Sequence, residues 1–171
     1  IYQALALNKT EPRLRRLGYE LVLASACQIL WVILFQSRFF TLSLLAMLGI
    51  LIPLIRLYLR LEINRFIVNR KQGLLVNAPI SIYFAWITVA TIVNVASVLD
   101  WINWQRWGLT DQIWTVIILV IGTIIAILVG LNRKDRDFIG VFIWAFLAIA
   151  VKQISRPLIA NKLAETISEH L

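Results

Sequence analysis

The sequence has one cysteine and one histidine in 171 residues, and this scarcity excludes several kinds of site. Cys27 lies inside an apolar run, so the chain has no disulfide framework and no C-x-x-C metal or redox pair. As a small apolar residue, Cys27 is explained by packing. His170 lies beside the C-terminus, so we expect no His-based metal or haem-ligand cluster within the chain.

Charged residues are also few, at 15% of the chain. No apolar run holds two carboxylates, a histidine, or a lysine–acid pair that could form a proton relay or an ion pathway. A Ser-His-Asp set, a Cys-His set and a Gly-rich phosphate loop are missing from the sequence as well. We therefore expect no hydrolysis, phosphoryl transfer or metal chemistry, no required cofactor, and a protein that is not an enzyme.

Apolar residues, in contrast, make up 60% of the chain, above the roughly 45–50% of a soluble domain. Five apolar runs approach or exceed the roughly 20 residues that cross a bilayer as a helix. The sequence therefore predicts an all-α, polytopic transmembrane helix bundle that forms one domain over residues 1–171. The expected spans are residues 17–35, 39–59, 79–99, 113–131 and 138–154, followed by a surface tail at 155–171.

The start of the chain and a proline inside the second span lead to two further expectations. The chain begins with Ile1-Tyr2-Gln3, without Met, and this start is typical of the end of an earlier helix. We therefore expect further spans upstream of residue 1. Pro53 lies inside the second span, where a membrane helix is expected to kink rather than break.

Lysine and arginine are distributed unevenly between the two sides of the predicted bundle. Of 17 such residues, 12 belong to the N-terminal segment, the second connection and the fourth connection. The positive-inside rule then places residues 1–16, 60–78 and 132–137 in the cytoplasm or its equivalent, and the C-terminal tail on the other side. Membrane topology thus explains the net charge of +8, and no nucleic-acid partner is expected.

The third span carries a stripe of polar and aromatic residues at helical spacing. Such a stripe must face protein, a cavity or a ligand, because lipid cannot satisfy its hydrogen bonds. Ser and Thr can bond to their own helix, whereas the amide of Asn94 has two donors and an acceptor to satisfy. Asn94 therefore bonds either to a neighbouring helix or to a ligand. The stripe consists of Tyr83, Trp86, Ala90, Asn94, Ser97 and Trp101, which step by three or four residues.

The first span has a similar face, with Glu20, Ala24, Gln28 and Trp31 spaced by four, four and three residues. Glu20 is close enough to the predicted cytoplasmic end to reach water or to pair with Arg16. Gln28 lies deeper and needs a partner, either a neighbouring helix or a ligand. Four tryptophans near one end of the third and fourth spans are expected to form an interfacial aromatic belt, namely Trp101, Trp104, Trp107 and Trp114.

Two segments resemble the tryptophan-rich sensory protein/translocator protein (TspO/MBR) family. The stretch from Pro79 through Tyr83, Trp86 and Thr91 to Asn94 is similar to the Pro-Tyr, Trp-Val, Ala-Thr and Leu-Asn run of that family's last helix. Gln28-Ile-Leu-Trp31-Val-Ile-Leu-Phe35 is similar to its Leu-Asn-x-x-Trp-x-x-x-Phe segment, with Gln28 where Asn is usual. The resemblance covers about residues 14–101, and two further spans follow it, so the chain looks like a longer branch with extra C-terminal helices.

The resemblance implies a receptor or sensor that binds a porphyrin, a haem-type tetrapyrrole, a pigment or another lipophilic small molecule between its helices. It also implies a homodimer, in a bacterial inner membrane or a thylakoid membrane. The sterol-type motif requires a central Tyr and a terminal Lys or Arg, which Val95–Leu99 does not offer. By resemblance, the pocket would be lined by Gln28, Trp31, Tyr83, Trp86, Thr91 and Asn94.

A second hypothesis belongs to another functional class. The spans after residue 113 are nearly featureless, and tryptophans gather at one interface. Both features also suit an accessory subunit that packs on a larger membrane complex, for example a photosynthetic one, and has no ligand chemistry of its own.

Overall fold

The computed structural model describes the backbone of residues 19–66, 69–102, 104–105, 108 and 110–168, and their side chains up to residue 152 except for residues 111 and 112. All the regular structure in this part is helical, which confirms the predicted all-α bundle. Within these described residues, three segments are long and apolar enough to cross a membrane: Phe40–Arg60, Arg70–Trp101 and Ile113–Arg133. The helices are α2 (Glu20–Gln36), α3 (Phe40–Arg60), α4 (Arg70–Gln72), the π-helix η3 (Gly73–Asn77), α5 (Ala78–Trp101), α6 (Asp111–Arg133) and α7 (Arg136–Ser168).

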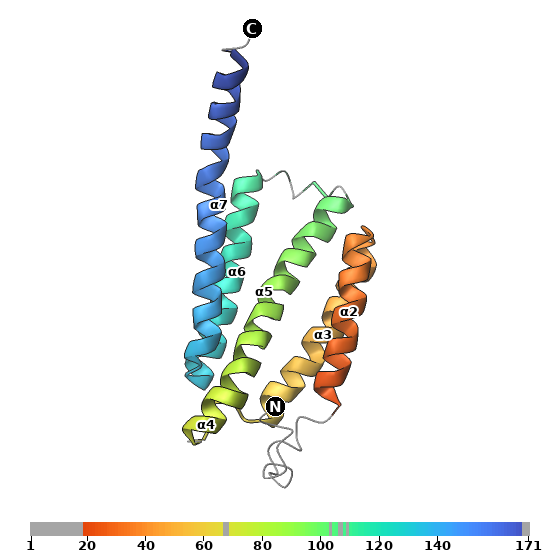
Figure 1. Ribbon diagram of the computed structural model, residues 1–171, viewed down its shortest axis with the longest axis vertical. Coiled ribbons are helices and arrows are strands. Elements are labelled where there is room, and N and C mark those ends of the chain that lie inside the picture. The colour runs from red at the N-terminus through yellow and green to blue at the C-terminus, as the bar shows by residue number, and fades with distance from the viewer. Residues whose placement is uncertain (1–18, 67–68, 103, 106–107, 109, 169–171) are drawn as a thin grey trace.

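Helix α5 lies between two helical hairpins, the α2–α3 pair on one side and the α6–α7 pair on the other (Figure 1). Helices α3 and α7 both pack directly on α5. At the C-terminal end, α7 extends well beyond the other helices (Figure 1). It runs through Pro157 to Ser168 as one helix, and the division into a span that ends at residue 154 and a surface tail after it stays a prediction.

The turn between α2 and α3 is only three residues long and closes by a specific backbone pattern. Arg38 has a left-handed φ of 62°. Its N–H donates to Phe35 O at 3.1 Å, and the N–H of Phe39 donates to Leu34 O at 2.9 Å. These two bonds satisfy carbonyl groups at the end of α2 and reverse the chain, so that α2 and α3 pack antiparallel.

Helix α3 ends in the same way. Glu62 has φ of 48°, its N–H donates to Leu59 O at 3.1 Å, and the N–H of Ile63 donates to Tyr58 O at 3.5 Å. Ile63 is fully buried, which is the apolar contact that often accompanies this motif. The described chain then resumes at Asn69, whose Oδ1 accepts the Lys71 N–H at 3.4 Å and caps α4.

The third span begins earlier than the apolar pattern predicted. Helix is continuous from Arg70 to Trp101 through one π-helical segment, so residues 70–77, expected in a polar connection, are helical. Residues 100–108 are described in part. Trp104 packs edge-on against Trp114 with ring centroids 4.8 Å apart. Trp107 of the predicted belt lies outside the described residues.

The core is an aromatic and aliphatic layer where α3, α5 and α7 meet. Ring centroids follow one another at 5.0 Å from Tyr58 to Phe84 and at 5.2 Å from Phe84 to Phe138. Helices α2 and α3 come close where Gly49 faces Cys27, because a Cβ at position 49 would lie 2.9 Å from the Cys27 Sγ. The cysteine therefore has a packing role.

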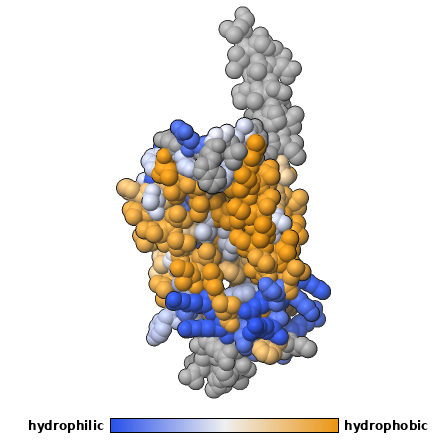
Figure 2. Space-filling view, turned by 180° about the vertical axis from the view of Figure 1, so that it is seen from behind, coloured by the Kyte–Doolittle hydropathy of each residue, from blue (hydrophilic) through white to orange (hydrophobic). Residues whose placement is uncertain are grey.

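The outer surface has the pattern expected of helices in a bilayer. On the face that Figure 2 shows, a broad apolar band covers the bundle, and hydrophilic side chains gather at one end of it. At that end, Glu20 forms an ion pair with Arg60 of α3, with 3.0 Å between Oε1 and Nη1. The alternative partner considered from the sequence, Arg16, lies outside the described residues.

Candidate functional site

Asn94 is deeply buried between α5 and α3, with 2% of its surface exposed. Its Oδ1 lies 3.2 Å from the Oγ of Ser43, a fully buried residue in the first turn of α3. The Ser43 hydroxyl has one proton, which can go to Asn94 Oδ1 or to Phe40 O at 2.7 Å. In either case the Asn94 amide NH₂ finds no acceptor in the part of the chain that the structure describes.

Two side chains of α2 also bury a polar atom that has no partner within the described part of the chain. They are Gln28, through Oε1, and Trp31, through Nε1, and they lie one turn apart on the same helix. Trp31 stacks on Phe35 with ring centroids 5.3 Å apart. No hydrogen bond among the described residues joins either side chain to Asn94. This part of the bundle thus holds one unmatched acceptor and two unmatched donor groups.

An aromatic row connects this region to the end of the bundle at the α2–α3 turn. It consists of Trp31, Phe35, Phe40 and Trp101, whose successive ring centroids are 5.2–5.3 Å apart. The row therefore crosses from α2 to the end of α5, and Ser43 and Asn94 lie deeper along α3 and α5. Beside Phe40 and Trp101 is an open cavity of about 330 Å³, lined by Ser37, Arg38, Phe39, Phe40, Thr41, Leu42 and Trp101.

The other three predicted site residues occupy different surroundings. Trp86 is 46% exposed and packs against Trp144 of α7, with ring centroids 5.5 Å apart. Thr91 donates its hydroxyl proton to Ile87 O of its own helix at 2.7 Å. Tyr83 is half-buried against the core. The stripe on α5 is therefore divided, because Trp86 meets α7 while Asn94 meets α3.

The structure reveals a second polar centre that the sequence reasoning missed. Asp135 is fully buried in the short link between α6 and α7. Its Oδ2 accepts the hydroxyl protons of Tyr58 and Ser81, each at 2.7 Å, and its Oδ1 accepts the Phe138 N–H at 3.1 Å. One carboxylate thus joins α3, α5 and the start of α7. An Asp directly before an apolar helix is a capping signal, which could have been recognised in the sequence.

Two charged residues, Arg133 and Asp137, precede and follow Asp135 closely in the sequence and flank this polar centre. The guanidinium carbon of Arg133 lies 5.7 Å from the centroid of the Tyr58 ring, and its Nη1 is buried without an acceptor among the described residues. Partial desolvation, together with the like charge of Asp135, raises the pKa of Asp137 above its ordinary value. Among the residues whose positions are described, no three His, Cys, Asp or Glu side chains lie together as metal ligands.

Comparison with protein families gives a match to the family described as TSPO-like protein, over residues 1–167. This match extends across almost the whole chain. The chain belongs to the TSPO-like protein family. Neither the comparison with curated proteins nor the comparison with solved structures gives a match.

Family membership settles two points about this TSPO-like chain. It is an integral membrane protein, since the family match coincides with long apolar helices. The matched region also includes α6 and α7, which the resemblance stated from residues 14–101 did not reach. The α6–α7 hairpin therefore belongs to the region that the family shares.

Proposed function

We propose that this TSPO-like chain is a membrane receptor or sensor that binds a lipophilic small molecule of tetrapyrrole type between α2, α3 and α5. The observation that carries the proposal is the set of buried polar atoms on Gln28, Trp31 and Asn94 that have no partner among the residues whose positions are described. Buried polar groups in proteins are nearly always hydrogen-bonded, so several unmatched atoms in one part of a bundle favour a missing partner.

The chemistry of these atoms describes the partner. Trp31 and Asn94 offer N–H donors and Gln28 offers an acceptor, so the ligand needs both acceptors and a donor at its polar edge. Each buried group left unsatisfied costs about 1–3 kcal/mol, which a ligand of this kind would recover. The aromatic row beginning at Trp31 adds flat apolar surface for a ring system. The role we propose is binding, without a catalytic step.

Titration with protoporphyrin IX tests this proposal in purified protein in a neutral detergent, with the shift of porphyrin absorbance as the readout. We expect saturable binding that weakens by tenfold or more in the double variant Gln28→Leu/Asn94→Leu, on the order of what two lost hydrogen bonds cost. Asn77→Leu is the matched control, because Asn77 is also buried with an unmatched Oδ1 but lies at the other end of α5. Non-saturable uptake, or equal affinity in all three proteins, would reject the site.

A second candidate function is an accessory subunit of a larger membrane complex. The outward pair Trp86 and Trp144, 46% and 60% exposed, favours it as a contact surface for a neighbouring subunit. Native gel electrophoresis of gently solubilised membranes separates the two candidates. A protein that always migrates alone, as a monomer or a homodimer, supports the receptor.

Our proposal includes the location that the family resemblance implies, a bacterial inner membrane or a thylakoid membrane.

A further inference from the structure

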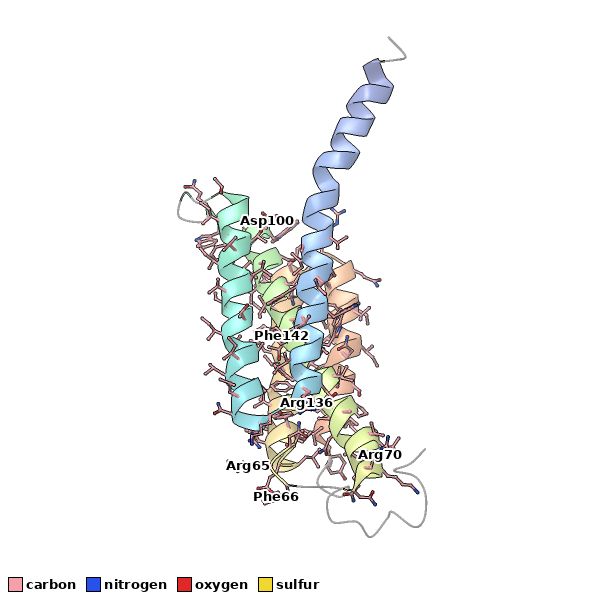
Figure 3. The ribbon with its side chains drawn as sticks, turned by 90° about the vertical axis from the view of Figure 1, so that its left-hand side faces the viewer. Arg65, Phe66, Arg70, Asp100, Arg136 and Phe142 are labelled. Carbon is pink, nitrogen blue, oxygen red and sulfur yellow. The ribbon has the colours of Figure 1, made fainter. Side chains whose placement is uncertain are left out.

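One end of the bundle carries a group of cations. In the described part of the chain, none of them forms an ion pair, while Arg60 at the same end is paired with Glu20. Figure 3 shows Arg65, Arg70 and Arg136 at this end, and Figure 2 shows a hydrophilic surface below the apolar band. We call this group the basic end; it consists of Arg65, Arg70, Lys71, Arg133, Lys134 and Arg136.

The link between α6 and α7 shows why these charges are not neutralised locally. Its sequence, Arg133-Lys134-Asp135-Arg136-Asp137, contains two acids for three cations. Asp135, however, is fully buried and its carboxylate is turned inward to Tyr58, Ser81 and the Phe138 N–H. Lys134 has a left-handed φ of 51°, and both Lys134 and Arg136 are exposed. Asp137 is the exposed acid of the link, so the outward charge remains positive.

Apolar surface continues directly up to these cations. Leu131, two residues before Arg133, is 76% exposed, and Leu74 of η3 is exposed close to Lys71 in the sequence. Arg133 also has a buried Nη1 donor for which the described residues provide no acceptor. A partner that fits this surface is an anion attached to an apolar body, with phosphate oxygens for the cations and acyl chains along the exposed leucines.

We propose that the basic end binds the phosphate headgroup of an anionic phospholipid in the adjoining leaflet, with Arg133, Lys134 and Arg136 as its centre. This inference is independent of the ligand proposed between α2, α3 and α5. Juxtamembrane Lys and Arg side chains each strengthen attraction to anionic lipid, by roughly fivefold in affinity per cation. The interaction weakens as salt screens the charges.

Native mass spectrometry of the purified full chain tests the proposal. The protein is mixed with phosphatidylglycerol or phosphatidylcholine in neutral detergent micelles, and the bound lipids are counted as the lipid concentration rises. We expect phosphatidylglycerol to bind at least tenfold more tightly than phosphatidylcholine. The variant Arg133→Gln/Lys134→Gln/Arg136→Gln should lose most of this preference, whereas Arg38→Gln, at the opposite end, should retain it. Equal preference in the triple variant and the parent protein would overturn the proposal.

A second variant and a competition experiment complete the test. If the triple variant does not fold, the double variant Lys134→Gln/Arg136→Gln replaces it, because both side chains are exposed and should be separable from packing. Its preference for phosphatidylglycerol should fall by on the order of tenfold. Inorganic phosphate is added as a competitor at millimolar concentration. We expect it to leave lipid binding unchanged, and its displacement of phosphatidylglycerol would instead indicate a site for a soluble anion and reject the lipid.

Discussion

Three buried donors at the α6–α7 link depend on one carboxylate. Asp135→Ala would leave the Tyr58 hydroxyl, the Ser81 hydroxyl and the Phe138 N–H without an acceptor. Because each unsatisfied buried group costs about 1–3 kcal/mol, we expect a loss of about 3 kcal/mol in unfolding free energy after partial relaxation. Thermal unfolding in detergent measures the loss, and an alanine variant as stable as the parent would contradict this account.

Asp135→Asn is the matched control for the same position. Asparagine keeps an oxygen that can cap α7 and is a good N-cap residue. It cannot accept from all three donors as well as a carboxylate, since one of its side-chain atoms is now an NH₂ group. We therefore expect a smaller loss of about 1 kcal/mol, in the same unfolding experiment.

Asn94 should behave differently, because its amide NH₂ is already unmatched without a ligand. Asn94→Leu removes one hydrogen bond to Ser43, which in a membrane bundle averages about 0.6 kcal/mol, and also removes a buried donor that has no acceptor. We expect the melting temperature of the ligand-free protein to change little while affinity for protoporphyrin IX falls. A clear drop in melting temperature with unchanged affinity would make Asn94 a structural residue.

Side-chain spacing predicted part of the candidate site and missed the rest for a physical reason. Gln28 and Asn94 were singled out because a polar atom inside an apolar helix needs a partner, whereas Trp31 was assigned to the pocket by the family resemblance. Spacing defines which residues share a face of one helix, but the neighbour of that face depends on how the helices rotate against one another. Trp86 therefore meets Trp144 although it belongs to the stripe of Asn94, and Ser43 was not anticipated.

At the scale of the elements, the end of α3 offers a test of backbone strain. Glu62 closes the helix with φ of 48°, a conformation that costs a residue with a Cβ about 1–2 kcal/mol relative to its right-handed form. Glu62→Gly should remove this cost and stabilise the protein by about 0.5–1 kcal/mol after the entropy of glycine is subtracted. Glu62→Ala keeps the Cβ and should give no such gain. Equal stability of the two variants in thermal unfolding would speak against strain at this position.

The helices themselves were predictable, while their ends were less so. Long apolar runs determine that residues form helices in a bilayer, because every backbone group must be satisfied within the segment. The continuous helical segment that ends with α5 begins with α4 at residue 70, because Asn69 supplies a cap, a local bond that apolar periodicity does not register. Helix α7 continues past Pro157 to Ser168, since proline removes only one donor and can leave a helix unbroken.

For the whole molecule, the charge asymmetry predicts the orientation in the membrane. Single cysteines at Lys134 and Ser37, in a Cys27→Ala background, lie at exposed positions on opposite ends of the bundle. Because the basic end should face the cytoplasm, an impermeant thiol reagent added to intact cells should label position 37 and leave position 134 unlabelled. Labelling at position 134 alone would reverse the proposed orientation.

The central claim for the whole molecule is that a ligand binds where α2, α3 and α5 meet. The most direct measurement is the dissociation constant of protoporphyrin IX for Trp31→Phe beside that for Trp86→Phe. Both variants keep an aromatic ring and remove an indole N–H, but the Nε1 of Trp31 is buried and unmatched, whereas Trp86 is 46% exposed and packs on Trp144. We expect the Trp31 variant to bind roughly five- to a hundredfold more weakly and the Trp86 variant to match the parent. Weakened binding in the Trp86 variant with full affinity in the Trp31 variant would contradict the account.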